Sequence, residues 1–120
     1  GHNNTHYYEN LKRCASDSNL FDKLEDPILI VDANDSRIYF VNNSYQDEFG
    51  IEYRKVVNNA FFDVLCPELS ETLQKVFNKI KDSETLRWNG YDLRINTISN
   101  EREHIPLYFL LTFIKRKPNV

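Results

Sequence analysis

Residues 27–42 read PILIVDANDSRIYFVN, and this stretch decides the fold. Its two ends, residues 27–32 and 37–42, are short runs rich in β-branched and aromatic residues, which favour strands. The ANDS corner between them, residues 33–36, holds asparagine and aspartate, which tolerate tight-turn dihedral angles and hydrogen-bond to their own backbone. The pattern predicts a β-hairpin. We expect the rest of the chain to pack on this hairpin.

The stretch after the hairpin is predicted to contain short helical segments and then one long helix. Residues 44–49 read as a short helix, and Gly50 follows where a left-handed C-terminal cap is expected. Further short turns are expected at 53–57 and 60–65. From residue 67, a proline and glutamates come first and lysines come last, an order that suits the helix dipole. Apolar residues at helical spacing predict one buried face of this long helix, formed by Leu69, Leu73, Val76, Phe77 and Ile80.

The last part of the chain is predicted to be β-structure. Residues 84–88 and 91–99 flank Asn89-Gly90, which is the strongest short hairpin signal, and residues 104–115 form a final strand. We expect one face of this strand to carry Ile105, Leu107, Phe109, Leu111 and Phe113, and the other to carry Tyr108, Leu110 and Ile114. Because both faces are apolar, both sides of the sheet are expected to be covered.

The N-terminal region supplies a candidate cover for the second face. Residues 1–19 hold Gly1-His2, read here as a cloning remnant, and an amphipathic segment with apolar residues at helical spacing. This segment is expected to cover the sheet either from its own chain or from the partner in a homodimer. The candidates for the dimer or flanking-helix contact are Tyr7, Leu11, Tyr108 and Leu110.

Length, charge and cysteine content narrow the class of protein. A chain of 120 residues is long enough for one domain with a core and too short for two. With a net charge of -3 and no positive run denser than residues 115–117, no nucleic-acid partner is expected. No apolar run approaches the roughly 20 residues that cross a bilayer, so we expect no membrane contact. Cys14 and Cys66 lack metal-ligand spacing, which predicts no metal site and favours a reducing, cytoplasmic compartment.

The order of these predicted elements resembles a PAS domain: two strands, several short helices, one long helix and three antiparallel strands. Asp32 ends the first strand and Asn42 the second, and Gly50 follows Asn42 by eight positions. The run FFDVLCPE at residues 61–68 is also similar to sequences of that family. The resemblance covers about residues 20–115.

The resemblance implies an α+β fold with a five-stranded antiparallel sheet in the order 2-1-5-4-3. Short helices and one long helix are expected on one face of the sheet, with a small cavity beneath them, in addition to the N-terminal amphipathic helix. The domain is expected at residues 20–116, and residues 117–120 are expected to begin a linker to an output domain of a longer parent protein. Asn58 stands where the family often has glycine, and residues 112–114 replace the usual Asp-Ile-Thr end, so coupling to a downstream helix is expected to differ.

The resemblance also implies a function. Such a module is sensory or regulatory and non-enzymatic, and it controls an output domain such as a histidine kinase, a cyclic-dinucleotide enzyme or a transcription factor. The rival interpretation is a constitutive interaction module whose core is filled by its own side chains. Catalysis is not expected, because His104 stands at a strand start and no serine or cysteine nucleophile has a sequence-local partner.

The residues argue against the cofactors of related proteins. The position of the flavin-reactive cysteine in light-oxygen-voltage domains is Ala60 here, and residues 69–82 contain no histidine to ligate haem. Cys66 lies near the chromophore attachment point of photoactive yellow protein, but the chromophore's hydrogen-bonding Tyr and Glu correspond to Val41 and Tyr45. No cofactor is therefore predicted. Cys66 is expected to be a small buried residue or a helix cap.

An aromatic-rich interior provides the candidate site. The ligand-pocket candidates are Tyr45, Phe49, Phe61, Phe77, Trp88, Tyr91, Arg94 and Phe109. Their aromatic side chains either fill the core or line a pocket for a small apolar or amphipathic ligand. Arg94 is the only fixed charge among them, and if it faces inward it favours a carboxylate or a phosphate. Tyr39, Tyr45, Asn42 and Thr112 are further polar candidates, depending on the face that each takes.

Overall fold

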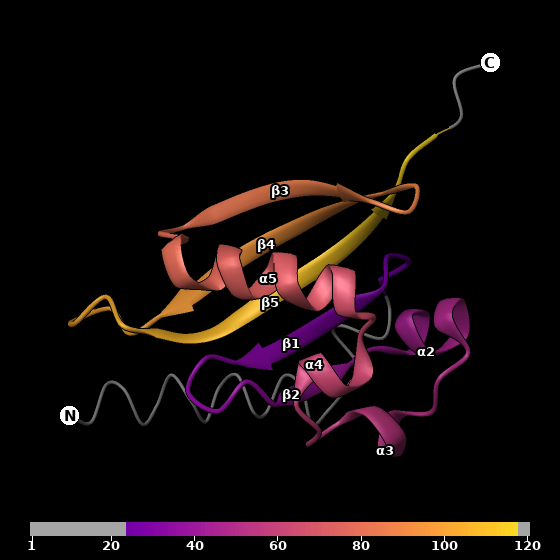
Figure 1. Cartoon of the computed structure of the whole chain (residues 1–120), viewed down its shortest axis with the longest axis horizontal. Helices are drawn as coiled ribbons and strands as arrows, with labels where there is room; N and C mark the ends of the chain where they lie inside the picture. Colours follow the sequence, from indigo (N-terminus) through magenta and orange to yellow (C-terminus); the bar gives the residue numbers. More distant parts are fainter. Residues whose placement is uncertain (1–23, 118–120) are drawn as a thin grey trace.

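The computed structural model describes residues 24–117, which form an antiparallel sheet with short helices and one long helix (Figure 1). The strands are β1 (Ile28–Asp32), β2 (Ile38–Val41), β3 (Ser83–Trp88), β4 (Tyr91–Ser99) and β5 (Pro106–Lys115). Their order in the five-stranded sheet is β2-β1-β5-β4-β3, as expected, with every neighbouring pair antiparallel. The predicted N-terminal segment near Tyr7 and Leu11 lies outside the described residues.

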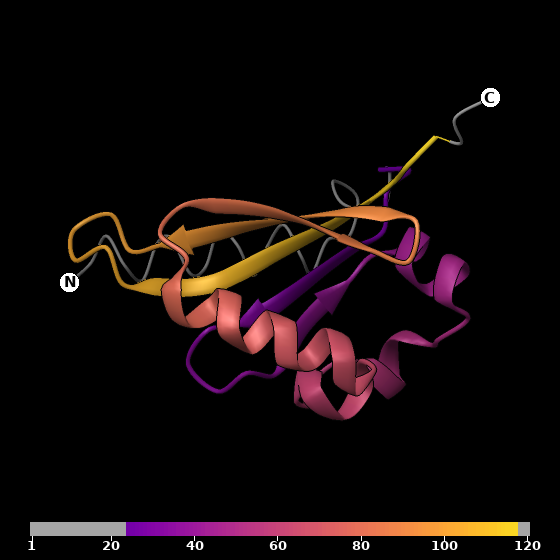
Figure 2. The same ribbon diagram turned by 45° about the horizontal axis from the view of Figure 1, so that its top comes forward.

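Helices between β2 and β3 cover one face of this sheet (Figure 2). They are α2 (Asn43–Phe49), α3 (Tyr53–Val56), α4 (Phe61–Val64) and α5 (Pro67–Lys79). In α5, Pro67 opens the helix and Glu68 lies in its first turn, where a carboxylate favours the helix dipole. Leu69, Leu73 and Val76 are buried against the sheet, which confirms the predicted apolar face.

Two residues that carry the family resemblance have clear structural roles. The buried Asn42 side chain caps α2 by accepting from Tyr45 N at 3.0 Å, and it also accepts from Ile28 N at 2.9 Å. It therefore ties the start of β1 to the start of α2. Gly50 ends α2 with a φ of 66°, in the left-handed region that favours glycine. Asn58 adopts the same region with a φ of 72°, a conformation that asparagine tolerates well.

The sheet has two apolar faces, as the final strand predicts. On the inner face, beneath the helices, Phe109, Leu111 and Phe113 of β5 are buried. The outer cluster on the opposite face consists of Ile28, Ile30, Phe40, Leu107 and Tyr108, with Tyr39, Ile98 and Leu110 packed at its edge.

Two predictions for the inward face of the final strand are wrong. Ile105 is 51% exposed and precedes β5, and Leu107 packs with the outer cluster. Ile105 follows a turn in which His104 has a left-handed φ of 55° and donates its backbone N–H to Asn100 O. At Leu107 the register with β4 shifts, because Ser99 pairs with Pro106 and Ile98 pairs with Tyr108, so the regular alternation of β5 begins at Tyr108.

Candidate functional site

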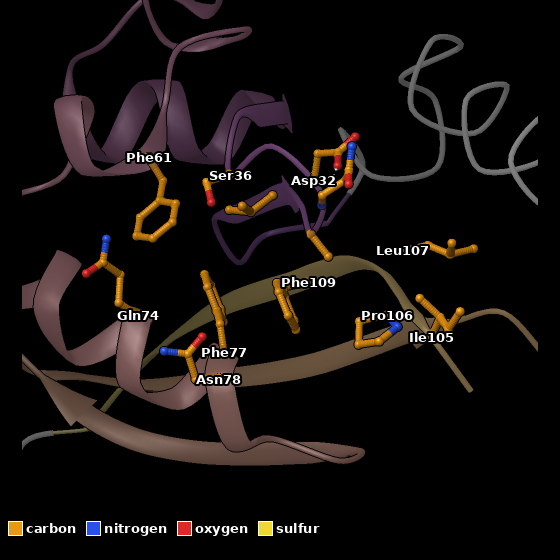
Figure 3. A pocket seen from close by; sticks show the side chains of 13 residues that line it. Asp32, Ser36, Phe61, Gln74, Phe77, Asn78, Ile105, Pro106, Leu107 and Phe109 are labelled. Carbon is orange, nitrogen blue, oxygen red and sulfur yellow. Dashed lines mark hydrogen bonds between the residues drawn. The ribbon is translucent and has the colours of Figure 1, made fainter. Parts of the chain in front are cut away.

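An open cleft of about 690 Å³ lies at one end of the inner face. It is bounded by the β1–β2 corner, by α4 and α5, and by the start of β5 (Figure 3). The lining residues are Val31, Asp32, Ala33, Asn34, Ser36, Phe61, Gln74, Phe77, Asn78, Ile105, Pro106, Leu107 and Phe109.

Three phenylalanines form the apolar wall of the cleft. Phe77 of α5 stacks on Phe109 of β5, with ring centroids 4.0 Å apart and an interplanar angle of 1° (Figure 3). Phe61 of α4 meets Phe77 edge-on, at a centroid distance of 5.4 Å. Phe61 and Phe109 are buried, whereas Phe77 is half-buried. Part of the Phe77 side chain is therefore accessible to a ligand in the cleft.

Polar groups line the rest of the cleft. Gln74 and Asn78 are exposed and stand four residues apart on α5, so they share one side of that helix. At the opposite wall, Asp32 Oδ1 accepts from Asn34 N at 2.8 Å and holds the β1–β2 corner in place. The thirteen lining residues include one carboxylate and no lysine, arginine or histidine.

The other end of the inner face is filled by aromatic rings. This aromatic cluster consists of Tyr45, Phe49, Trp88, Tyr91 and Phe113, with ring centroids 4.7 to 6.3 Å apart. Most of these pairs are tilted or edge-to-face, as aromatic side chains prefer. Burial raises the pKa of Tyr45 to about 12, because an apolar environment disfavours the phenolate.

A polar contact closes the aromatic cluster at the protein surface. The Tyr91 hydroxyl donates a hydrogen bond to Glu48 Oε1, and Lys115 Nζ lies 3.4 Å from the same oxygen. The hydrogen bond from Tyr91 and the charge of Lys115 lower the pKa of Glu48. Burial and the Glu48 carboxylate raise the pKa of Tyr91 to about 12. The contact joins α2, β4 and the end of β5. Along the sequence, Glu48 is separated from Tyr91 by 43 positions and from Lys115 by 67, so no local sequence pattern reveals the contact.

The structure divides the predicted pocket residues into two groups. Phe61, Phe77 and Phe109 line the cleft, whereas Tyr45, Phe49, Trp88 and Tyr91 pack in the aromatic cluster. Arg94 is exposed and alternates with the buried Leu93 and Ile95, so it lies on the outer face. The expectation that Arg94 lines the pocket is therefore wrong.

Several other polar candidates also lie away from the cleft. Thr112 pairs with Arg94 on the outer face, and Tyr39 packs on Tyr108 there at a ring distance of 5.0 Å. Cys66 occupies the N-cap position of α5 without a side-chain capping bond, and it is exposed rather than buried. Ser36, Gln74 and Asn78 also line the cleft but were not predicted, because polar residues in such a sequence context are typical of any protein surface.

Residues 24–117 show neither a membrane-spanning helix nor a cluster of metal-ligating side chains. This part of the chain has no helix that is both long and apolar enough to cross a membrane. It also has no group of three or more histidine, cysteine, aspartate or glutamate residues placed to hold a metal ion.

Comparison with known proteins supports the fold. No protein-family model and no curated protein matches the sequence. The structure is similar to a sensory box sensor histidine kinase from Vibrio cholerae, with a TM-score of 0.68 and 16% identity over 95% of this chain and 99% of that chain. The PAS domain of the histidine kinase ThkA gives a TM-score of 0.63 and 21% identity over 75% of this chain and 98% of its own.

A third similar structure is the photoactive yellow protein domain of the sensor histidine kinase Ppr from Rhodospirillum centenum. Its TM-score is 0.58 and its identity 16%, over 79% of this chain and 89% of that domain. These similarities, together with the sheet order, show that the chain has the fold of PAS domains.

Proposed function

We propose that this chain is a non-enzymatic sensory module of a signalling protein and that it binds a small molecule in the cleft beside Phe77 and Phe109. The observation that carries the proposal is the cleft of about 690 Å³, a volume in the range of small-molecule sites. Its lining combines aromatic rings with polar groups that could fix the orientation of a ligand. The fold is shared with domains of sensor histidine kinases, which supports a sensory role.

A ligand in this cleft would contact elements that also reach the other end of the domain. Phe109 of β5 lines the cleft, and Phe113 of the same strand lies in the aromatic cluster. A signal requires that the ligand bind one arrangement of these elements more tightly than another. We propose that β5 passes this preference to an output domain in the same cytoplasmic protein, such as a histidine kinase or a cyclic-dinucleotide enzyme.

The test compares two substitutions on α5. Asn78→Trp places a bulky ring in the cleft wall, whereas Lys75→Trp adds the same ring at an exposed position outside the lining. Native mass spectrometry of the purified protein and ligand-observed NMR with a metabolite library would measure binding. We expect a compound that binds the wild type and the Lys75→Trp protein but not the Asn78→Trp protein. Equal binding to all three proteins, or no bound compound, contradicts the proposal.

The outer cluster favours a second role, which is homodimerisation. The apolar side chains Ile30 and Leu110 belong to the face opposite α2–α5, and an apolar face of a sheet requires a cover. We propose that the segment near Tyr7 and Leu11 supplies it, from the same chain or from a second copy. A constitutive dimer without a ligand would fulfil the alternative role of an interaction module.

Leu110→Glu tests this second role, because it places a charge at the edge of the outer cluster. The control is Thr85→Glu, which adds the same charge at an exposed position of β3. We expect Leu110→Glu alone to weaken the dimer, measured by light scattering after size exclusion, or to lower the melting temperature. If mass and melting temperature match those of the control, the outer cluster is not this contact.

A further inference from the structure

We infer that the cleft selects an uncharged, flat heteroaromatic compound carrying an amide-like edge with both a hydrogen-bond donor and an acceptor. This inference rests on the proposed function, since it names the ligand class of the same cleft. Three features of the lining support it: its charge, its aromatic wall and the two side-chain amides that α5 contributes.

The charge of the lining disfavours an anionic ligand. Asp32 is the only charged lining residue, and no cationic side chain accompanies it. The nearest arginine along the chain, Arg37, donates its Nη1 hydrogen bond to Asn58 O and does not line the cleft. A carboxylate or phosphate entering the cleft would lose water without gaining a cationic partner, which is unfavourable. An uncharged compound avoids this loss.

The aromatic wall favours a flat ring. Phe77 and Phe109 are parallel within 1°, and the half-buried Phe77 borders the open volume (Figure 3). Phe61 stands edge-on to Phe77 at an interplanar angle of 75° and is buried, as is Phe109, so both rings support Phe77 from behind. A planar aromatic ligand can contact the accessible part of Phe77 by the stacked or edge-to-face geometries that aromatic groups prefer.

The two amides give the ligand its polar requirement. Gln74 and Asn78 flank Phe77 on α5, and neither side chain makes a hydrogen bond with another described residue. Each amide offers an acceptor oxygen and a donor nitrogen. A ligand edge with an adjacent donor and acceptor can form two hydrogen bonds with one such amide. Asparagine and glutamine recognise the edges of heteroaromatic bases in this bidentate way. Stacking on Phe77 would bring that edge within reach of its neighbours on the helix.

Nicotinamide and nicotinate provide a matched pair of probes, because they share one flat ring and differ in an amide against a carboxylate. Cyclohexanecarboxamide keeps the amide and removes the flat ring. Titration of the full chain with each compound, followed by amide resonances in two-dimensional NMR, would measure three dissociation constants. We expect nicotinamide to shift resonances of cleft residues and to bind at least tenfold more tightly than either of the other compounds.

Substitutions assign the effect to the cleft. Gln74→Leu should weaken nicotinamide binding several-fold, whereas the adjacent Lys75→Leu should leave it unchanged, since Lys75 does not line the cleft. Equal or tighter binding of nicotinate overturns the inference about charge while leaving small-molecule binding in place. Equal binding of cyclohexanecarboxamide overturns the inference about the flat ring. If no probe shifts a cleft resonance, the inference is wrong, and the Asn78→Trp comparison still decides the proposed function separately.

Discussion

The aromatic cluster around Phe113 and the cleft beside Phe77 lie on the same face of one sheet, and both are built from aromatic rings. In the cluster, rings from α2, β3, β4 and β5 meet from several directions and fill the interior. In the cleft, the rings of Phe77 and Phe109 face a corner of short side chains, including Ala33 and Ser36, which do not reach across. An open site therefore depends less on the number of aromatic residues than on what stands opposite them.

Truncation of one ring in each region should give the largest effect and should separate the two regions. Phe113 is fully buried, so Phe113→Ala is expected to reduce the free energy of unfolding by about 3–5 kcal/mol. Phe77 is half-buried at the cleft wall, and Phe77→Ala should cost roughly half as much. Urea denaturation of both variants measures the difference. Equal losses would show that the cleft is packed as tightly as the cluster.

The contact between Glu48 and Tyr91 should give an intermediate effect, confined to the cluster. Glu48→Gln is expected to lower the melting temperature at pH 7. The control is Asp47→Asn at the neighbouring exposed position, which should leave the melting temperature unchanged. Because the pKa of Glu48 is lowered on folding, its stabilising effect is present above its ordinary value of 4.5 and is lost as the pH falls through the lowered pKa. A difference between wild type and Glu48→Gln that persists in acid would contradict this account.

Alkaline pH tests the same contact from the side of Tyr91. Its pKa is raised from 10.0 to about 12, so the stability that the neutral hydroxyl provides is complete below pH 10 and is lost as the pH rises through about 12. Tyr91→Phe removes the ionisable group, and this variant should lose less stability than the wild type between these two pH values. Parallel thermal melts across that range provide the measurement. Identical loss in both proteins would show that Tyr91 is not the group responsible.

The smallest effect is expected at Thr97, which pairs with Phe109 in the sheet next to the cleft. Thr97 Oγ1 is buried and has no hydrogen-bond partner among the described residues. Thr97→Val replaces this hydroxyl by a methyl group of similar shape and should raise the free energy of unfolding by about 1 kcal/mol. Chemical denaturation would detect the gain. A loss of stability would mean that the hydroxyl is satisfied, for example by water.

Sequence patterns predicted the scaffold because its determinants are local. Asn89 and Gly90 both take the positive φ that their hairpin needs, at 45° and 81°. Gly50 ends α2 with the left-handed cap that the sequence predicts, and Asn42, which the resemblance places at the end of the second strand, caps the start of α2. Strand alternation also indicates the position of Arg94. Its neighbours Leu93 and Ile95 lie on the inner face, so Arg94 lies on the outer face.

The cleft could not be predicted in the same way, because it is formed by residues that are distant in the sequence. Ser36, Gln74 and Asn78 are ordinary surface residues in their local context, and only the folded chain brings them to one hollow. The position of Ile105 likewise depends on the left-handed turn at His104 rather than on its hydrophobicity. The number of aromatic residues indicated an unusual interior without showing which end of it is open.

The most direct test of the proposed site is a crystal structure of the full chain as purified from cells. We expect electron density for a small molecule beside Phe77 and Phe109, within contact distance of Gln74 or Asn78. A cleft closed by the side chains of Phe77 and Ile105, with no room for a ligand, would contradict this expectation.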